Sequence, residues 1–138
     1  MTIEATAERL HSAAIRLLRL LRREDDMSGL SAPRLSALSV IVFSDGIALG
    51  ALAAAEQVRP PTMTRIVDAL VAAGLVVREA DPADRRIVRL SATGKGREIL
   101  LAGKARRVEA LSRRLRTLSA EDRKSLDRAA ALIERVTR

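Results

Sequence analysis

The sequence contains no cysteine and only one histidine, His11. Without thiols the chain forms no disulfide, performs no thiolate catalysis and offers no cysteine ligands for a metal. One histidine is too few for a histidine cluster, so we expect no metal site and no cofactor. Asp25 and Asp26 are adjacent and do not face each other on a helix, so they form no acid–base pair. We therefore expect no catalytic residues and no enzyme.

Aromatic residues are almost absent, with one Phe and no Trp or Tyr. The core must be aliphatic, and RNA-binding sheets or single-strand channels that stack bases on aromatic rings are disfavoured. No uncharged stretch approaches the length of a membrane span. The N-terminal segment lacks the basic start and cleavage site of a signal peptide. These absences predict a cytoplasmic protein without a membrane partner.

Charge is plentiful but unevenly distributed. The chain has 25 Lys and Arg against 17 Asp and Glu, a net charge of +8, and residues 91–138 alone hold thirteen basic and six acidic groups, or +7. A basic excess indicates an anionic partner, most often nucleic acid. Here, however, the arginines alternate with aliphatic residues, which favours the solvated face of an amphipathic helix over a DNA-binding stripe. The arginines concerned are Arg106, Arg107, Arg113, Arg114 and Arg116.

The length of 138 residues fits one domain, and the chain divides into three segments. Residues 1–27 hold a helix over 3–21, whose apolar seam needs a partner surface. Residues 31–92 hold shorter elements, and residues 93–138 hold two helices, the first capped by Ser91 and the second by Ser119. We expect the first and third segments to dimerise the protein. The seam consists of Ile3, Ala7, Leu10, Ala14, Leu17 and Leu21.

The middle segment predicts a winged helix-turn-helix. A helix after Ser31 is followed by a small-residue helix over 49–56, two prolines and a helix over 62–73. Two β-rich runs, 75–79 and 86–90, flank an Asp-Pro turn and predict a hairpin. The fold class expected is mainly α, with a small β-hairpin wing and terminal dimerisation helices.

The helix over 62–73 carries the chemistry expected of a recognition helix. Its N-terminus would present free N–H groups and a positive dipole end to phosphate. Thr62 and Thr64 can contact phosphates or thymine methyl groups, and Arg65 can form paired hydrogen bonds with guanine. The alternative is that Thr62 only caps the helix and Arg65 is a solvated surface charge.

The hairpin tip places Asp84, Arg85 and Arg86 together. An exposed arginine there can reach phosphates or a narrow minor groove. It can instead form a local ion pair, in which Asp81 or Asp84 holds Arg86 and stiffens the loop. We expect both arrangements to occur, with Arg86 held and Arg85 presented to DNA.

Residues 60–94, PPTMTRIVDALVAAGLVVREADPADRRIVRLSATG, resemble the MarR family of bacterial transcriptional regulators. The run 64–68 is similar to the family's recognition helix, and Asp81-Pro82 followed by Asp84-Arg85-Arg86 is similar to its wing. Leu90-Ser91 followed by Gly94 resembles the exit from the second wing strand. Arg59 departs from the family pattern, which often has Ser or Thr there.

The resemblance implies a homodimer that lays two winged lobes on successive major grooves of a double-stranded DNA operator, about 10 base pairs apart. It also implies repression that ends when a small, often aromatic, anion binds between the dimerisation helices and the lobe. His11, Arg16 and Arg19 are candidate ligand-binding residues. The DNA-binding candidates are Pro61, Thr62, Thr64 and Arg65 on the helix and Asp84, Arg85 and Arg86 on the wing.

A protein with the same winged-helix fold could instead have a different class of function. A winged-helix module that has lost DNA binding would serve protein–protein interaction instead. Arg65 and the basic wing argue against that alternative, and we expect sequence-specific binding of double-stranded DNA.

Overall fold

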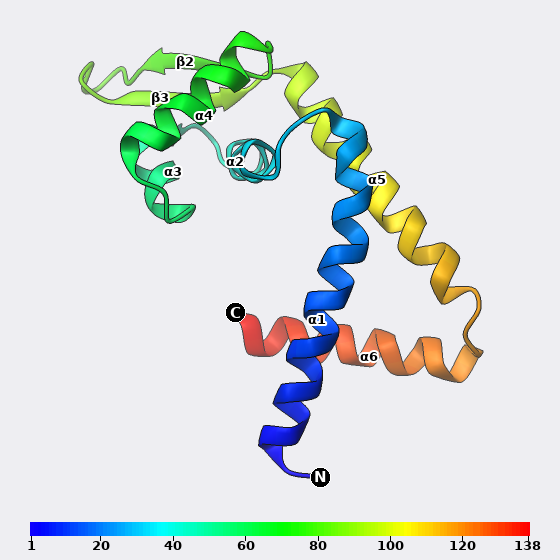
Figure 1. Cartoon of the computed structure of the whole chain (residues 1–138). Helices are drawn as coiled ribbons and strands as arrows, with labels where there is room; N and C mark the ends of the chain where they lie inside the picture. The colour runs from blue at the N-terminus through cyan, green and yellow to red at the C-terminus, as the bar shows by residue number, and fades with distance from the viewer.

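The computed structural model describes residues 1–138 and confirms the expected fold class. The chain forms six α-helices and a small three-stranded antiparallel sheet (Figure 1). None of the helices combines the length and the hydropathy that a membrane-spanning segment requires. In chain order the elements are α1 (Ile3–Asp25), a 3₁₀ turn η1 (Asp26–Ser28), α2 (Ala32–Val42), β1 (Ile47–Ala48), α3 (Leu49–Ala55), α4 (Pro60–Ala72), β2 (Val76–Ala80), β3 (Val88–Ala92), α5 (Gly94–Leu115) and α6 (Ala120–Thr137). Helices α2, α3 and α4 pack beside the sheet in one lobe.

One aliphatic core holds the winged lobe together. Helix α4 contributes Met63, Val67 and Leu70, which recur at spacings of four and three and are fully buried. They pack with α2, α3 and the strands, so the polar edge of α4 is left facing outward. The buried cluster is Ala37, Leu38, Ile41, Leu52, Ala53, Met63, Val67, Leu70, Leu75, Val76 and Leu90.

The sheet has the strand order β1-β3-β2. The two-residue strand β1 pairs Ile47 with Leu90 and was not predicted, because two residues are too few to show alternation. The prediction of 86–90 for the second wing strand was wrong by two residues, since β3 begins at Val88. The wing turn is longer than expected because the N–H of Ile87 donates to the Asp84 carbonyl oxygen at 3.0 Å, which keeps residues 84–87 in a turn.

This two-residue shift also moves the start of α5. The predicted cap, Ser91, lies in β3 opposite Val77, and Thr93 caps α5 instead, with its hydroxyl accepting from the Gly96 N–H at 3.1 Å. The cap predicted for α6 is confirmed, because the Ser119 hydroxyl accepts from the Asp122 N–H at 3.0 Å.

The recognition-helix candidate starts earlier than predicted. Helix α4 begins at Pro60, so both prolines lie in its first turn. The turn before α4 contains Gln57 at φ 54°, a left-handed conformation that usually favours glycine. Gly74 follows the helix at φ 75°, as expected for a residue just past a helix C-terminus.

The terminal helices extend away from the lobe. In Figure 1, α1 and α5 diverge from a common junction beside α2, and α6 doubles back from the far end of α5. Helices α1 and α5 pack against each other, yet neither α1 nor α6 contains a buried residue. Aliphatic side chains on these helices are 39–84 % exposed, among them Ile3, Leu10, Ile15, Leu17, Leu18, Leu126, Leu132 and Ile133.

Candidate nucleic-acid interface

The N-terminal end of α4 is exposed and chemically simple. Because Pro60 and Pro61 have no N–H, the expected row of free amide groups is reduced to that of Thr62. The first hydrogen bond of the helix is made by Met63, whose N–H donates to the Arg59 carbonyl oxygen at 3.0 Å. Arg59 is the residue before the helix and makes no side-chain cap. The alternative that Thr62 only caps the helix is therefore wrong, since Thr62 lies inside it.

Thr64 and Arg65 differ in which of their polar groups remain available to bind a partner. The Thr64 hydroxyl donates to the Pro60 carbonyl oxygen at 3.0 Å, so its methyl group and oxygen lone pairs are what it offers outward. Arg65 is exposed and makes no ion pair with any acidic residue. One turn further along, Asp68 is paired with Arg78 of β2, which ties the outer face of α4 to the wing.

Asp81 organises the base of the wing. It is 7 % exposed, and its Oδ1 accepts from the N–H groups of Ala83 at 2.8 Å and Asp84 at 3.2 Å. Its Oδ2 accepts from Nε of Arg89 at 2.6 Å, and Arg89 also donates to the Gly46 carbonyl oxygen at 3.0 Å. The Arg89 hydrogen bond, helped by the Ala83 N–H, holds the pKa of Asp81 below its usual value.

The arginine at position 86 is held by Asp84, as expected. Its Nε lies 3.1 Å from Asp84 Oδ1, and this hydrogen bond, with that from the Arg86 N–H, lowers the pKa of Asp84. The alternative in which Asp81 holds Arg86 is wrong, because Asp81 is paired with Arg89. Arg85 is exposed and makes no ion pair, so it is the free cation of the wing tip. Its contact with DNA stays a prediction.

The candidate ligand residues do not converge on one cavity. His11, Arg16 and Arg19 are all exposed on α1, and Arg16 borders a hollow of about 380 Å³ whose lining does not include His11 or Arg19. A groove of about 350 Å³ lies further along, where α1, α2 and α5 meet. Arg107 of α5 crosses it to Asp25, with Nη1 2.6 Å from Oδ1. Its lining is Arg22, Asp25, Ala32, Leu35, Ser36, Ser39, Val40, Leu100 and Arg107.

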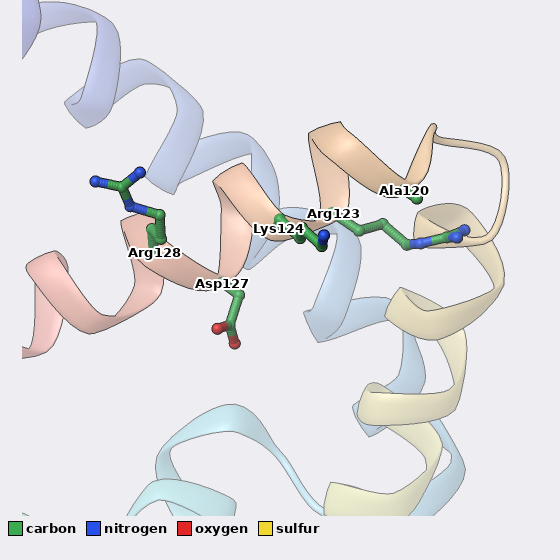
Figure 2. Close-up of a pocket in the computed structure, with 5 residues that line it drawn as sticks. All are labelled: Ala120, Arg123, Lys124, Asp127 and Arg128. Carbon is green, nitrogen blue, oxygen red and sulfur yellow. The ribbon is translucent and has the colours of Figure 1, made fainter.

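A wider hollow, of about 590 Å³, lies on α6 and is shown in Figure 2. All five lining residues come from that one helix: Ala120, Arg123, Lys124, Asp127 and Arg128. Arg123 turns back to the α5–α6 connection, where Nη1 donates to the Leu118 carbonyl oxygen at 3.1 Å. Without a second element the hollow has no opposing wall.

The solvated face favoured by the sequence concerns arginines on α5 and just after it. Arg113, Arg114 and Arg116 are exposed as expected. The prediction is wrong for Arg106 and Arg107, which are half-buried, because Arg107 is paired with Asp25.

Several residues that shape the interface were missed from the sequence. Arg89 and Arg78 hold the wing, and Arg107 borders the groove, yet each is separated from its partner by eight or more positions. Of these interactions, only the Asp81–Arg89 ion pair had a signal in the sequence. The Asp81-Pro82 turn indicated the position of Asp81, but nothing in the sequence indicated that Arg89 would be its partner.

Comparisons of the whole sequence identify relatives of one kind. The model of the MarR family matches residues 30–88. The chain is 41 % identical to the uncharacterized HTH-type transcriptional regulator ML2140 of Mycobacterium leprae over 127 residues, covering 92 % of this chain and 89 % of that protein. It is 39 % identical, with the same coverage, to the HTH-type transcriptional regulator MT0903.1 of Mycobacterium tuberculosis.

Solved structures share the fold along the whole chain. The crystal structure of RV1404 from Mycobacterium tuberculosis superposes with a TM-score of 0.86 at 22 % identity, covering 99 % of this chain and 95 % of that one. A MarR family protein from Bacillus stearothermophilus superposes with a TM-score of 0.81 at 24 % identity, covering 100 % and 99 %. The orientation of the terminal helices relative to the lobe is thus part of a shared architecture.

Proposed function

Because this chain belongs to the MarR family of transcriptional regulators, we propose that it is a homodimeric repressor that binds a specific double-stranded DNA operator in the cytoplasm and releases it when a small ligand binds. The family and the relatives are regulators and not enzymes. To family membership the proposal adds four statements about this protein: that it is a homodimer, that it represses transcription, which residues contact the operator, and that a ligand releases it.

The observation that carries DNA recognition is the placement of two unpaired arginines on one lobe. Arg65 lies on α4 and Arg85 on the wing, and neither is used by an ion pair of the protein. Their neighbours Arg78, Arg86 and Arg89 are each held by an aspartate. We assign Arg65 to base edges in the major groove and Arg85 to phosphates or the adjacent minor groove.

The remaining DNA candidates support these two arginines. Thr62 offers its N–H and hydroxyl to a phosphate at the helix N-terminus, and Pro61 lets the backbone approach there without a competing donor. Thr64 offers its methyl group to thymine. Asp84 fixes Arg86 and hence the shape of the wing tip.

Dimerisation through the terminal helices is supported by their exposed aliphatic side chains. Leu10, Leu17 and Leu18 of α1 are 43–53 % exposed, and Leu132 and Ile133 of α6 are 55 % and 40 % exposed. Burying apolar surface contributes about 25 cal/mol per Å², so a second copy that covers both helices would be stabilised strongly. Two lobes joined in this way would match half-sites one helical turn apart.

Ligand release is supported by the groove between α1, α2 and α5. It lies between the dimerisation helices and the winged lobe, and Arg22 provides an unpaired positive charge beside Leu35 and Leu100. Arg107 adds a guanidinium that is paired with Asp25 of the same lining. A small anion with an apolar body fits that lining. Within this proposal Arg22 and Arg107 take the role first given to His11, Arg16 and Arg19, which do not line that groove.

The function is tested by selecting bound sequences from random duplexes with the purified full chain, with and without a panel of aromatic acids. We expect one enriched sequence with two related half-sites, and weaker recovery in the presence of an effective acid. Recovery of no preferred sequence, together with a soluble dimer, would contradict operator binding and favour the protein-interaction module.

A further inference from the structure

Residues at the start of α5 donate hydrogen bonds to the carbonyl groups at the C-terminal end of α4, the recognition-helix candidate. Lys95 Nζ donates to the Ala73 carbonyl oxygen at 3.1 Å, and the Thr93 hydroxyl donates to that of Gly74 at 2.6 Å. The Thr93 N–H donates to the Leu75 carbonyl oxygen at 3.0 Å. Three consecutive carbonyls after α4 are therefore satisfied by one turn of α5, although helix C-termini usually leave such groups to water or to local turns.

The two elements also touch without an intervening side chain. Gly96 is buried, and a Cβ built on it would overlap the Leu75 carbonyl oxygen. Residues 93–96 and 73–75 thus form a backbone-to-backbone junction. Because contacts of this kind leave little freedom for rotation, the direction of α5 fixes the direction of the C-terminal end of α4.

The junction lies at the N-terminal end of α5, and other parts of α5 contact the groove and α1. Leu100 and Arg107 of the same helix line the groove described above, and α5 also packs against α1. A change in the direction of α5 would therefore reach α4 through the junction. Figure 1 shows α5 running directly from the lobe toward α6.

We propose that Lys95, together with Thr93, is a positioning residue that orients the recognition helix on the α5 rod and so sets the specificity of operator binding. Neither residue needs to touch DNA for this role. The inference rests on the proposed function, since it concerns how the same helix is held for its operator.

Lys95 has an ordinary alternative role that makes different predictions. It is exposed, so it could bind a DNA phosphate directly. Loss of a phosphate contact weakens binding uniformly across sequences and reduces the salt slope by about 1. Loss of a positioning residue lowers the affinity for the operator while leaving the number of neutralised phosphates, and hence the salt slope, unchanged.

The experiment compares Lys95→Met with Lys104→Met, which removes the same charge from an exposed position of the same helix. Dissociation constants for the selected operator and for a random duplex are measured at several salt concentrations. We expect Lys95→Met to weaken operator binding about tenfold, with the random duplex and both salt slopes unchanged. Lys104→Met should match the wild type, and Lys95→Arg, which restores a donor, should recover the affinity.

Three results would overturn the proposal. They are equal weakening on both duplexes with a reduced slope, operator binding by Lys95→Met that equals the wild type, and failure of Lys95→Arg to recover any affinity. Melting temperature and dimer mass are recorded for each variant, so that a loss of folding is recognised separately. A wild-type protein that selects no sequence would overturn the proposed function itself, whereas a selective wild type with an equally selective Lys95→Met overturns this inference alone.

Discussion

Nε of Arg89 donates to Oδ2 of Asp81 at 2.6 Å, and this ion pair joins the second wing strand to the residue that follows the first. The other oxygen of Asp81 accepts from two backbone N–H groups of the turn. One carboxylate therefore fixes both the turn and the spacing of the strands behind Arg85. The wing presents its free arginine from a stiff base.

The wing should loosen in acid. The pKa of Asp81 is lowered chiefly by the Arg89 hydrogen bond, so its contribution to stability is fully present above the unfolded value, near 3.8, and is lost as the pH falls through the lower folded value. We expect the free energy of unfolding of the wild type to fall as the pH is lowered from neutral to below the unfolded value of 3.8. Denaturant unfolding across that range measures it.

Asp81→Asn is the control for that pH dependence. The amide cannot titrate, so the variant should be less stable at pH 7, and the difference from the wild type should shrink toward pH 2. A constant difference across the range would contradict the role of Asp81. Asp84 titrates in the same direction because of Arg86, and Asp84→Asn separates its share.

Arg65→Ala should relax specificity at one base position of each half-site. A paired hydrogen bond to a guanine contributes about 1–3 kcal/mol of discrimination. Arg65→Lys keeps the charge without the planar fork, so it should retain the salt dependence yet lose much of the discrimination. Competition binding with single-base operator variants measures both, and discrimination by Arg65→Ala equal to the wild type would disprove the assignment.

Arg85→Ala and Arg86→Ala form a matched pair at the wing tip. Arg85 is free, so its removal should weaken binding and reduce the salt slope by about 1. Arg86 is engaged by Asp84, so its removal should change the slope less. Titration at several salt concentrations distinguishes them. Equal slopes for Arg85→Ala and the wild type would contradict a wing contact.

Leu17→Asp should convert the dimer to monomers. Leu17 lies on the apolar seam of α1 and is 43 % exposed in one chain, and burial of a leucine contributes about 1.5–3 kcal/mol. A buried aspartate adds a desolvation cost. Ser12→Asp places the same charge on an exposed position of that helix and should leave the dimer intact. Light scattering reports the mass, and a dimeric Leu17→Asp would contradict the proposed interface.

Gln57→Gly should stabilise the fold. Gln57 has φ 54° in the turn before α4, a conformation that costs a residue with a Cβ about 1–2 kcal/mol. Glycine removes that cost but loses more chain entropy on folding, so we expect a gain of up to about 1 kcal/mol. Thermal unfolding measures it. A lower melting temperature would show that the Gln57 side chain contributes more than the backbone conformation costs.

Local features of the sequence were sufficient for the architecture. Periodic apolar residues such as Met63, Val67 and Leu70 predicted the recognition helix and its buried face, and the Asp81-Pro82 turn between two β-rich runs predicted the wing. Each of these signals is complete within a few neighbouring residues.

The tertiary structure decided the details that depend on distant partners. It ended the wing turn two residues later, and it divided the arginines into those held by Asp68, Asp81 and Asp84 and those left free. It also brought Lys95 to the end of α4, across twenty-two positions of sequence. Spacing along a chain sets periodicity and turns, but hydrogen bonds and ion pairs depend on positions in space, which are fixed only when the core packs and the helices take their final directions.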